Sequence, residues 1–241
     1  MVTSIPKKIH YCWFGKKDKP EIVVKCIDSW KKVLDDYEII EWNESKFDIN
    51  CNTYVKQAYE RGKFAFVSDY VRIKVLYDYG GIYLDTDVEV FKTFDDLLEN
   101  DSFWGFEESN YIATSTIGAK KQNKIIGEFI DLYKGQSFID EFGQISKTTN
   151  VSMITKLLAS KGVNMNGKYQ QVDSMTIYPR EILSPYDYSN CRNFTTEDTY
   201  CIHHFYKSWL PLSQRIKSSI KYNIANVIGG DNIAKIREII Q

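Results

Sequence analysis

Two aspartates one residue apart, Asp85 and Asp87, directly follow a short apolar run at 82–84. That run, and the two glycines before it, predict a buried strand that ends at the carboxylates. Unpaired carboxylates at the end of a buried strand are costly, and a divalent cation removes that cost. Such oxygen ligands select Mg²⁺ or Mn²⁺, which can also bind phosphate. The alternative is a pair of solvated loop aspartates. An EF-hand is excluded because Val90 occupies the position of its glycine.

Asp69 and Arg72 lie three residues apart in the stretch 64–79, whose apolar periodicity predicts a helix. Residues at this spacing share one face of a helix. We interpret them either as an intrahelical ion pair of little energetic weight, which the spacing alone favours, or as contacts to a bound donor molecule.

Two of the three histidines, His203 and His204, are adjacent in a predicted strand at 200–205. Side chains alternate along a strand, so only one of the two can face a given side. A histidine in a strand is usually a core residue, but two together indicate a metal or phosphate ligand. Trp13 ends the first predicted strand, where a doubly wound sheet binds a base, although a core position is the alternative.

These residues require a scaffold in which strands alternate with helices, as they do in the first hundred residues. Such alternation predicts a parallel sheet with crossover helices. Strands are predicted at 9–13, 37–42, 82–84, 88–91, 103–106, 112–119, 175–178 and 200–205. Helices are predicted at 20–34, 54–61, 64–79, 123–133, 148–161 and, in two pieces, 210–240.

The bulk composition suits one large α/β domain, since the chain has 241 residues and 43% hydrophobic residues. A net charge of -1 provides no basic field for a nucleic-acid backbone, so we expect no nucleic-acid partner. The five cysteines form no CxxC pair and are typical of reduced thiols. Residues 1–9 lack a signal-peptide core and no run is apolar enough to span a membrane, so we expect a cytoplasmic protein.

Four segments in order along the chain resemble the bacterial capsular-polysaccharide branch of glycosyltransferase family 32, the sugar-binding-region proteins with a DXD motif. They are the segments 5–15, 65–72, 80–87 and 202–209. That group is similar to the catalytic domains of glucosylating toxins and to the yeast initiating mannosyltransferase. The resemblance implies a GT-A fold at 1–209, a single α/β domain with a mixed, mainly parallel central sheet flanked by helices. A helical tail at 210–241 would follow.

By position, the resemblance also implies roles in binding the donor. Trp13 resembles the residue that stacks on the nucleobase, and Asp69 and Arg72 resemble the contacts to the donor sugar. Tyr83 resembles a contact in the donor pocket. Asp85 resembles the residue that contacts the ribose and the sugar and reaches the metal through water.

The remaining motif residues are implied at the metal and the diphosphate. Asp87 resembles the direct metal ligand, and Ser208 and Trp209 resemble the pair that closes on the diphosphate. We expect His203 to be a metal or phosphate ligand, with His204 as the alternative.

One departure from the family concerns the strand that corresponds to 112–117. Relatives often carry an asparagine there that faces the sugar, whereas this chain has only alanine, threonine and serine at 113–116. Either Thr114 or Ser115 substitutes for it, or the donor sugar differs.

The resemblance implies a retaining hexosyltransferase that depends on Mn²⁺ or Mg²⁺, with Asp85, Asp87 and Arg72 as its catalytic residues. We expect transfer from a nucleotide-sugar, a UDP-sugar, to a hydroxyl of a capsular polysaccharide, exopolysaccharide or O-antigen repeat unit. The alternatives are a nucleotide-sugar hydrolase and a non-catalytic subunit that binds nucleotide-sugars. The intact charges argue against the second, because a decayed site usually loses its charges first.

The tail at 210–241 carries apolar residues every four positions from Leu212 to Ile224, with basic residues beside them. The simpler interpretation is that its helices pack an apolar face onto the domain. The other is that part of the tail lies peripherally on the inner membrane surface, which would suit a lipid-linked acceptor.

Overall fold

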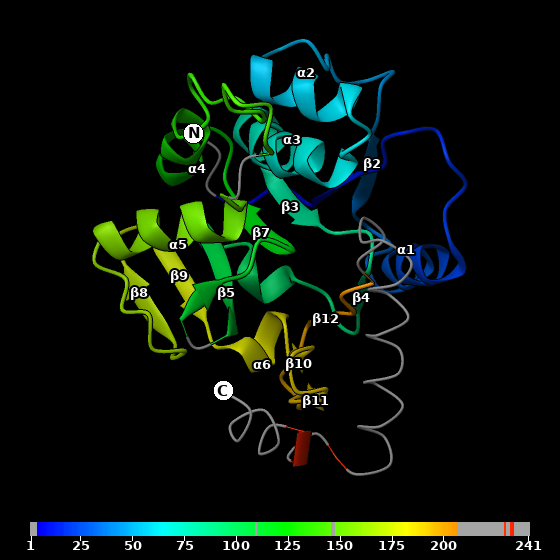
Figure 1. Cartoon of the computed structure of the whole chain (residues 1–241). Coiled ribbons are helices and arrows are strands. Elements are labelled where there is room, and N and C mark those ends of the chain that lie inside the picture. The colour runs from blue at the N-terminus through cyan, green and yellow to red at the C-terminus, as the bar shows by residue number, and fades with distance from the viewer. Residues whose placement is uncertain (1–3, 109, 146–147, 207–228, 230–231, 234–241) are drawn as a thin grey trace.

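The first strand, β1 (Lys8–Cys12), pairs in parallel with β2 (Glu38–Trp42) on one side and β3 (Gly81–Leu84) on the other. These three strands form one side of an eight-stranded sheet in a computed structural model that describes residues 4–108, 110–145, 148–206, 229 and 232–233 (Figure 1). The three strands run in one direction, so the loops that leave β1 and β3 lie at the same edge of the sheet.

The remaining five strands make the sheet mixed. β7 (Thr116–Ala119) runs antiparallel between β3 and β5 (Ser102–Glu108). β5 also pairs in parallel with β9 (Met175–Tyr178). The short strands β6 (Tyr111–Ile112) and β8 (Gln170–Val172) are antiparallel to their neighbours. Since β1, β2, β3, β5 and β9 share one direction, the expected mixed, mainly parallel sheet is confirmed.

Helices cover both faces of the sheet and create two hydrophobic clusters (Figure 1). One face packs on α2 (Thr53–Glu60), α3 (Phe64–Tyr79), α4 (Lys124–Asp131) and α5 (Asn150–Ser160). The other packs on α1 (Glu21–Val33), the 3-10 turn η1 (Asp95–Leu97) and α6 (Arg180–Leu183). Alternation along β3 sends Tyr83 to the first cluster and Ile82 and Leu84 to the second.

The junction between α3 and β3 depends on two glycines. Gly80 and Gly81 have φ angles of 67° and 115°, which residues with a side chain rarely adopt. A Cβ on Gly81 would also lie 2.7 Å from the carbonyl oxygen of Lys8 in β1. The glycines therefore end α3 as predicted and let β3 lie close against β1, which fixes where its last residues emerge.

The strand predicted at 112–119 is wrong as a single element, because residues 113–115 separate β6 from β7. The backbone there serves other partners: the carbonyl of Thr114 accepts from the Arg72 side chain, and that of Ser115 accepts from the N–H of Asp85. The sequence also did not predict β8, η1, α6, or the pair β10 (Tyr186–Asp187) and β11 (Arg192–Asn193).

Ser208, Trp209 and nearly all of the tail at 210–241 lie outside the described residues, so their expected roles stay predictions. Among the helices that are described, none is long and apolar enough to cross a membrane.

Candidate active site

Asp85 and Asp87 lie in the turn that joins β3 to β4 (Val88–Val90). The N–H of Asp85 donates to the carbonyl of Ser115, and its own carbonyl accepts from Val88. Ligand atoms of Asp85, Asp87 and His203 all lie within 4.8 Å of one another. The structure therefore brings the two strand-terminal carboxylates and one imidazole to a single point.

The histidine side chain is placed by strand pairing. β4 pairs antiparallel with β12 (Cys201–His203), and His203 lies opposite Val88. The Nε2 atom of His203 is 3.3 Å from Oδ1 of Asp87. The Nε2 atom of His204 is instead 2.9 Å from Oε2 of Glu89. Of the two histidines that the sequence left open, His203 is the one beside the aspartates.

Asp87 is held as a carboxylate. Burial alone raises its pKa, but the charge and hydrogen bond of His203 and the backbone N–H of Tyr206 together lower the pKa to about 2. The N–H of Tyr206 donates to Oδ2 at 2.7 Å. Burial lowers the pKa of His203, yet the charge of Asp87 gives a net increase, so each group favours the charged form of the other.

The turn that supplies this N–H contains a strained residue. Phe205 has a φ of 51°, in the left-handed region that bulky side chains rarely occupy. Its ring packs 3.9 Å from that of His203, centroid to centroid. Strain of this kind costs on the order of 1–3 kcal/mol and persists where surrounding contacts impose it. Here it directs the next N–H, that of Tyr206, toward Asp87.

Arg72 links both sides of the site. Its Nη2 atom lies 2.9 Å from Oδ1 of Asp69 and 3.2 Å from Oδ1 of Asp85. Its Nη1 atom donates to the carbonyl of Thr114 at 2.7 Å. The side chain is only 6% exposed, so this is not the weak surface pair that the spacing alone favoured. One buried guanidinium instead pairs with two carboxylates from different elements.

The pKa of Asp69 is shifted in the opposite direction from that of Asp87. Its burial raises its pKa to about 6, a change that nearby Asp85 reinforces and Arg72 opposes. Tyr83 is only 1% exposed, and its hydroxyl donates to Oδ1 of Asp85 at 2.9 Å. Arg72 lies over its ring at 4.7 Å. Tyr83 thus contacts both Asp85 and Arg72, and its expected contact with the donor stays a prediction.

Trp13 follows β1 at the edge of the sheet where Asp85 follows β3. Its indole N–H donates to the carbonyl of Lys17 at 2.7 Å. The ammonium of Lys19 lies 5.6 Å from the ring centroid and pairs with Glu41 at 2.8 Å. The half-buried indole is therefore fixed in orientation at the edge where α/β sheets bind ligands.

Asn150, at the start of α5, is a site residue that the sequence did not reveal. Its amide donates to Oδ1 of Asp69 at 2.7 Å, across 81 residues of chain, and the residue is 6% exposed. The only local signal was its place near a predicted helix start. Thr114, one expected substitute for the family asparagine, accepts hydrogen bonds from Arg72 instead. The side-chain oxygen of Ser115, the other, is buried without a hydrogen-bond partner in the described structure.

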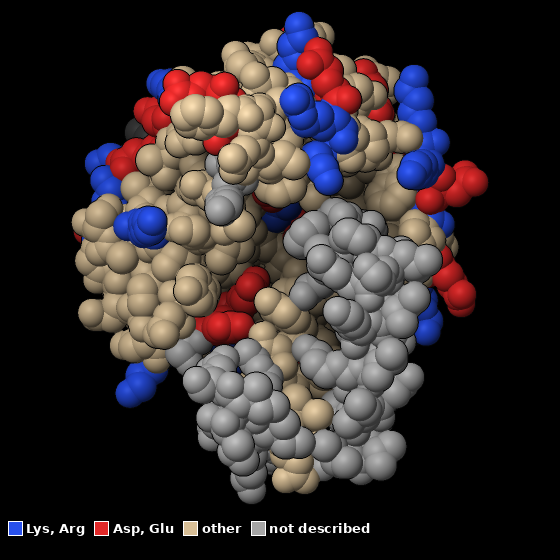
Figure 2. Space-filling view, viewed as in Figure 1, with Lys and Arg blue, Asp and Glu red and all other residues tan. Residues whose placement is uncertain are grey.

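The residues present fit a hard divalent cation. Two carboxylates and one imidazole converge, and each carboxylate is oriented by a further partner: Tyr83 for Asp85 and Tyr206 for Asp87. Figure 2 shows a hollow on this face of the molecule with acidic side chains at its border.

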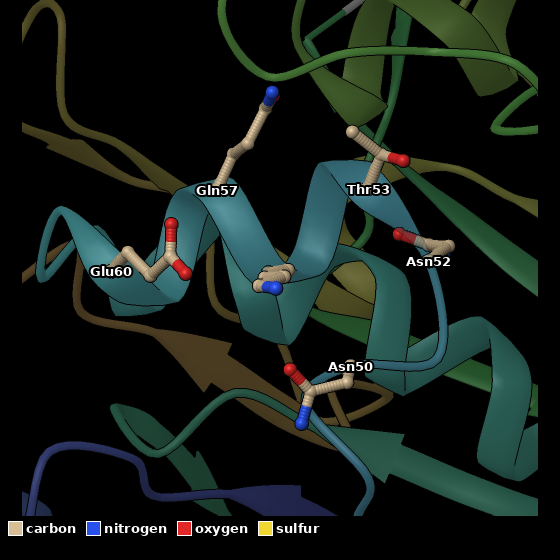
Figure 3. A pocket seen from close by; sticks show the side chains of 6 residues that line it. Asn50, Asn52, Thr53, Gln57 and Glu60 are labelled. Atoms are coloured by element: carbon tan, nitrogen blue, oxygen red, sulfur yellow. The ribbon is translucent and has the colours of Figure 1, made fainter.

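A surface depression elsewhere contains none of these residues. It lies beside α2, and the close-up in Figure 3 shows its polar side chains along that helix and the loop before it. Its lining consists of Asn50, Asn52, Thr53, Lys56, Gln57 and Glu60. Its lining has no cluster of carboxylates or histidines, unlike the end of β3.

Comparisons with known proteins cover the same part of the chain. Residues 20–104 match the family described as "Glycosyltransferase sugar-binding region containing DXD motif", a range that includes Asp69, Arg72, Asp85 and Asp87. The chain is 28% identical over 171 residues to "Subversion of eukaryotic traffic protein A" of Legionella pneumophila, across 56% of this chain and 26% of that protein.

It is also 31% identical over 125 residues to "Inositol phosphoceramide mannosyltransferase 3" of Schizosaccharomyces pombe, across 49% of this chain and 34% of that protein. The chain therefore spans about a quarter to a third of these relatives. Among solved structures it is similar to "PaToxG Glycosyltransferase", with a TM-score of 0.50, 22% identity, and coverage of 65% of this chain and 69% of that one. The fold is GT-A, and residues 20–104 match the glycosyltransferase family with the DXD motif.

Proposed function

We propose that this protein is a retaining, metal-dependent hexosyltransferase that uses a UDP-sugar as donor. The observation that carries the proposal is the convergence of Asp85, Asp87 and His203 beside the buried Arg72. Mn²⁺ or Mg²⁺ held by these three residues would neutralise the negative charge that develops on the departing diphosphate.

The other residues of the site orient the donor. Trp13 offers an indole face to the base, and Asp69, fixed by Arg72 and Asn150, accepts hydrogen bonds from hydroxyls of the sugar. Arg72 has two carboxylate partners already in place, so its guanidinium is positioned before the donor binds. This preorganisation supports a catalytic role over that of a non-catalytic subunit that only binds nucleotide-sugars.

Retention of configuration rests on the family resemblance. In the same-face reaction, the acceptor oxygen bonds to the anomeric carbon while the bond to the phosphate oxygen breaks. The acceptor proton passes to that departing oxygen. The product should therefore keep the α configuration of the donor, and a β-linked product in the proton NMR spectrum would contradict this mechanism.

We propose as acceptor a hydroxyl of a growing capsular polysaccharide, exopolysaccharide or O-antigen unit, reached from the cytoplasmic side and carried on a lipid. The name of the Schizosaccharomyces pombe relative, a mannosyltransferase, makes GDP-mannose the donor to test against UDP-sugars. A nucleotide-sugar hydrolase is the rival activity, and it would release free sugar at the same rate with or without an acceptor.

The test is a screen of UDP- and GDP-hexoses with Mn²⁺ or Mg²⁺, measured as nucleoside diphosphate released by the full chain. We expect one UDP-hexose to be turned over with the metal and none in excess chelator. Absence of turnover with every donor, or undiminished turnover in chelator, would overturn the proposal.

A further inference from the structure

The site has a second side, formed by β5, α6 and β12, that the donor-binding residues do not use. Glu107 is the penultimate residue of β5. Its neighbour Phe106 is fully buried in the cluster beneath α3, whereas a Cβ at Gly105, on the opposite face of the strand, would lie 3.0 Å from Leu183 of α6. The pairing of β5 with β6 shifts register between Phe106 and Glu108, so Glu107 lies at an irregularity at the end of the strand. The end of β5 that carries Glu107 therefore adjoins the face that α6 covers.

β12 covers the same face, because the Cys201 sulfur lies 3.5 Å from the Thr116 hydroxyl and 3.2 Å from the carbonyl of Leu183. Glu107 consequently lies near His203 and Arg180, and both act on its carboxylate electrostatically, as does Asp85. Its carboxylate is thus within electrostatic range of the expected metal site.

Several polar atoms on this side lack hydrogen-bond partners within the described residues, although the Arg180 guanidinium lies over the Phe194 ring at 4.8 Å. Nε and Nη2 of Arg180 and Nδ1 of His203 are buried without a hydrogen-bond partner in the described structure. No hydrogen bond or ion pair within the described residues holds the carboxylate of Glu107, and burial raises its pKa. Buried polar groups are nearly always paired, so an unpaired group at a reaction centre requires an explanation.

Resting on the proposed function, we infer that Glu107 and Arg180 form the acceptor subsite and that this subsite binds a neutral hexose unit. A carboxylate accepts hydrogen bonds from hydroxyls, and a guanidinium donates to hydroxyl or ring oxygens. Glu107 thereby orients the attacking hydroxyl toward the anomeric carbon without taking its proton. The subsite favours a neutral unit because Glu107 repels a sugar that carries a carboxylate.

The test compares Glu107→Gln with Glu108→Gln, which makes the same change of charge one residue further along β5. Acceptors are methyl hexopyranosides and the matching methyl hexuronides, with the donor fixed by the screen of wild-type protein. For Glu107→Gln we expect the ratio of transfer to hydrolysis to fall at least tenfold and the acceptor KM to rise, with little change in the donor KM. Glu108→Gln should resemble the wild type.

Two further measurements exclude a structural role. Glu107→Asp keeps the negative charge on a side chain that is one methylene shorter. It should give a ratio of transfer to hydrolysis between those of the wild type and Glu107→Gln. The preference of the wild type for hexopyranoside over hexuronide should narrow in Glu107→Gln. The inference is overturned if both Gln variants behave alike, or if transfer and hydrolysis fall together. If the wild type turns over no donor, the proposed function fails as well. If the wild type transfers normally but the variants give either of these results, only the acceptor subsite fails.

Discussion

The two sides of the site differ in how completely their polar groups are paired. On the donor side, formed by α3, β3 and α5, Arg72 satisfies Asp69 and Asp85, and Asn150 adds a second donor to Asp69. On the acceptor side, formed by β5, α6 and β12, Glu107 and Arg180 have no described hydrogen-bond partner. One side is complete before a ligand arrives, while the other is completed by the ligand.

This difference indicates where each side derives its specificity. A side whose groups hold one another is rigid and can bind a donor in one orientation. A side whose groups lack partners bears the cost of burial until a ligand supplies hydrogen bonds, so the wrong acceptor leaves that cost uncompensated. The metal site lies between them, and the predictions below test each side in turn.

The largest effect is expected where both sides meet. Asp87→Ala removes the carboxylate held by His203 and Tyr206, so activity should fall by roughly 10³-fold or more while the fold persists. Excess EDTA should do the same to the wild type, and added Mn²⁺ should reverse it. Turnover and circular dichroism check this together; full turnover in chelator would show that the centre works without metal.

The donor side can be broken at Arg72. Arg72→Met leaves Asp69 and Asp85 buried without their shared cation, which should lower the free energy of unfolding by about 3–5 kcal/mol. Lys74→Met, on the same helix, removes a half-exposed pair with Asp78 and should cost less than about 1 kcal/mol. Urea denaturation measures both, and equal losses would mean that the Arg72 network is no tighter than a surface pair.

Asn150 tests whether the donor side extends to α5. Asn150→Ala removes the amide that fixes Asp69, and the loss of one such hydrogen bond is about 1 kcal/mol, or roughly fivefold to tenfold in kcat/KM for the donor. Ser152→Ala, two residues further along α5, is the control. An unchanged kcat/KM in Asn150→Ala would limit the donor side to α3 and β3.

The smallest effect is a pH dependence with opposite signs for the two aspartates. In the folded protein the pKa of Asp69 is raised to about 6, so protonation of Asp69 favours the folded state. The contribution of Asp69 to the free energy of unfolding therefore grows as the pH falls from 7 toward 4. The folded pKa of Asp87 is lowered to about 2, so its stabilising contribution is lost as pH falls from about 4 toward 2. His203, whose pKa is raised on folding, stabilises the folded state fully below about pH 6.5. This stabilisation is lost as the pH rises through the folded pKa of His203.

Between pH 5 and 7, His203 and Asp69 both make the folded state more stable as the pH falls. The contribution of Asp69 is therefore isolated by subtracting the unfolding free energy of a variant that lacks its carboxylate. The unfolding free energy of the wild type minus that of Asp69→Asn should rise by on the order of 1 kcal/mol from pH 7 to pH 5. A flat difference would show that the Asp69 carboxylate is not buried as described.

The sequence by itself determined the elements whose signals are local. The apolar periodicity of α3 and the glycines that end it predicted Phe64–Tyr79 at its observed bounds. The apolar run before the aspartates predicted β3 and the end of that strand where Asp85 and Asp87 emerge. These features depend on contacts with near neighbours in sequence or on one-sided burial, which the order of residue types records.

Only the tertiary structure decided which distant residues complete the site. His203 rather than His204 joins Asp87 because β12 pairs with β4 in one register, and alternation alone leaves the two equivalent. The strand expected at 112–119 is interrupted because its carbonyls bind Arg72 and Asp85. Asn150 meets Asp69, and Glu107 comes within electrostatic range of His203, only through the packing of α5 and β12 against the sheet. Contacts of this range leave no periodic signal, because they depend on how whole elements pack rather than on the spacing of residues within one.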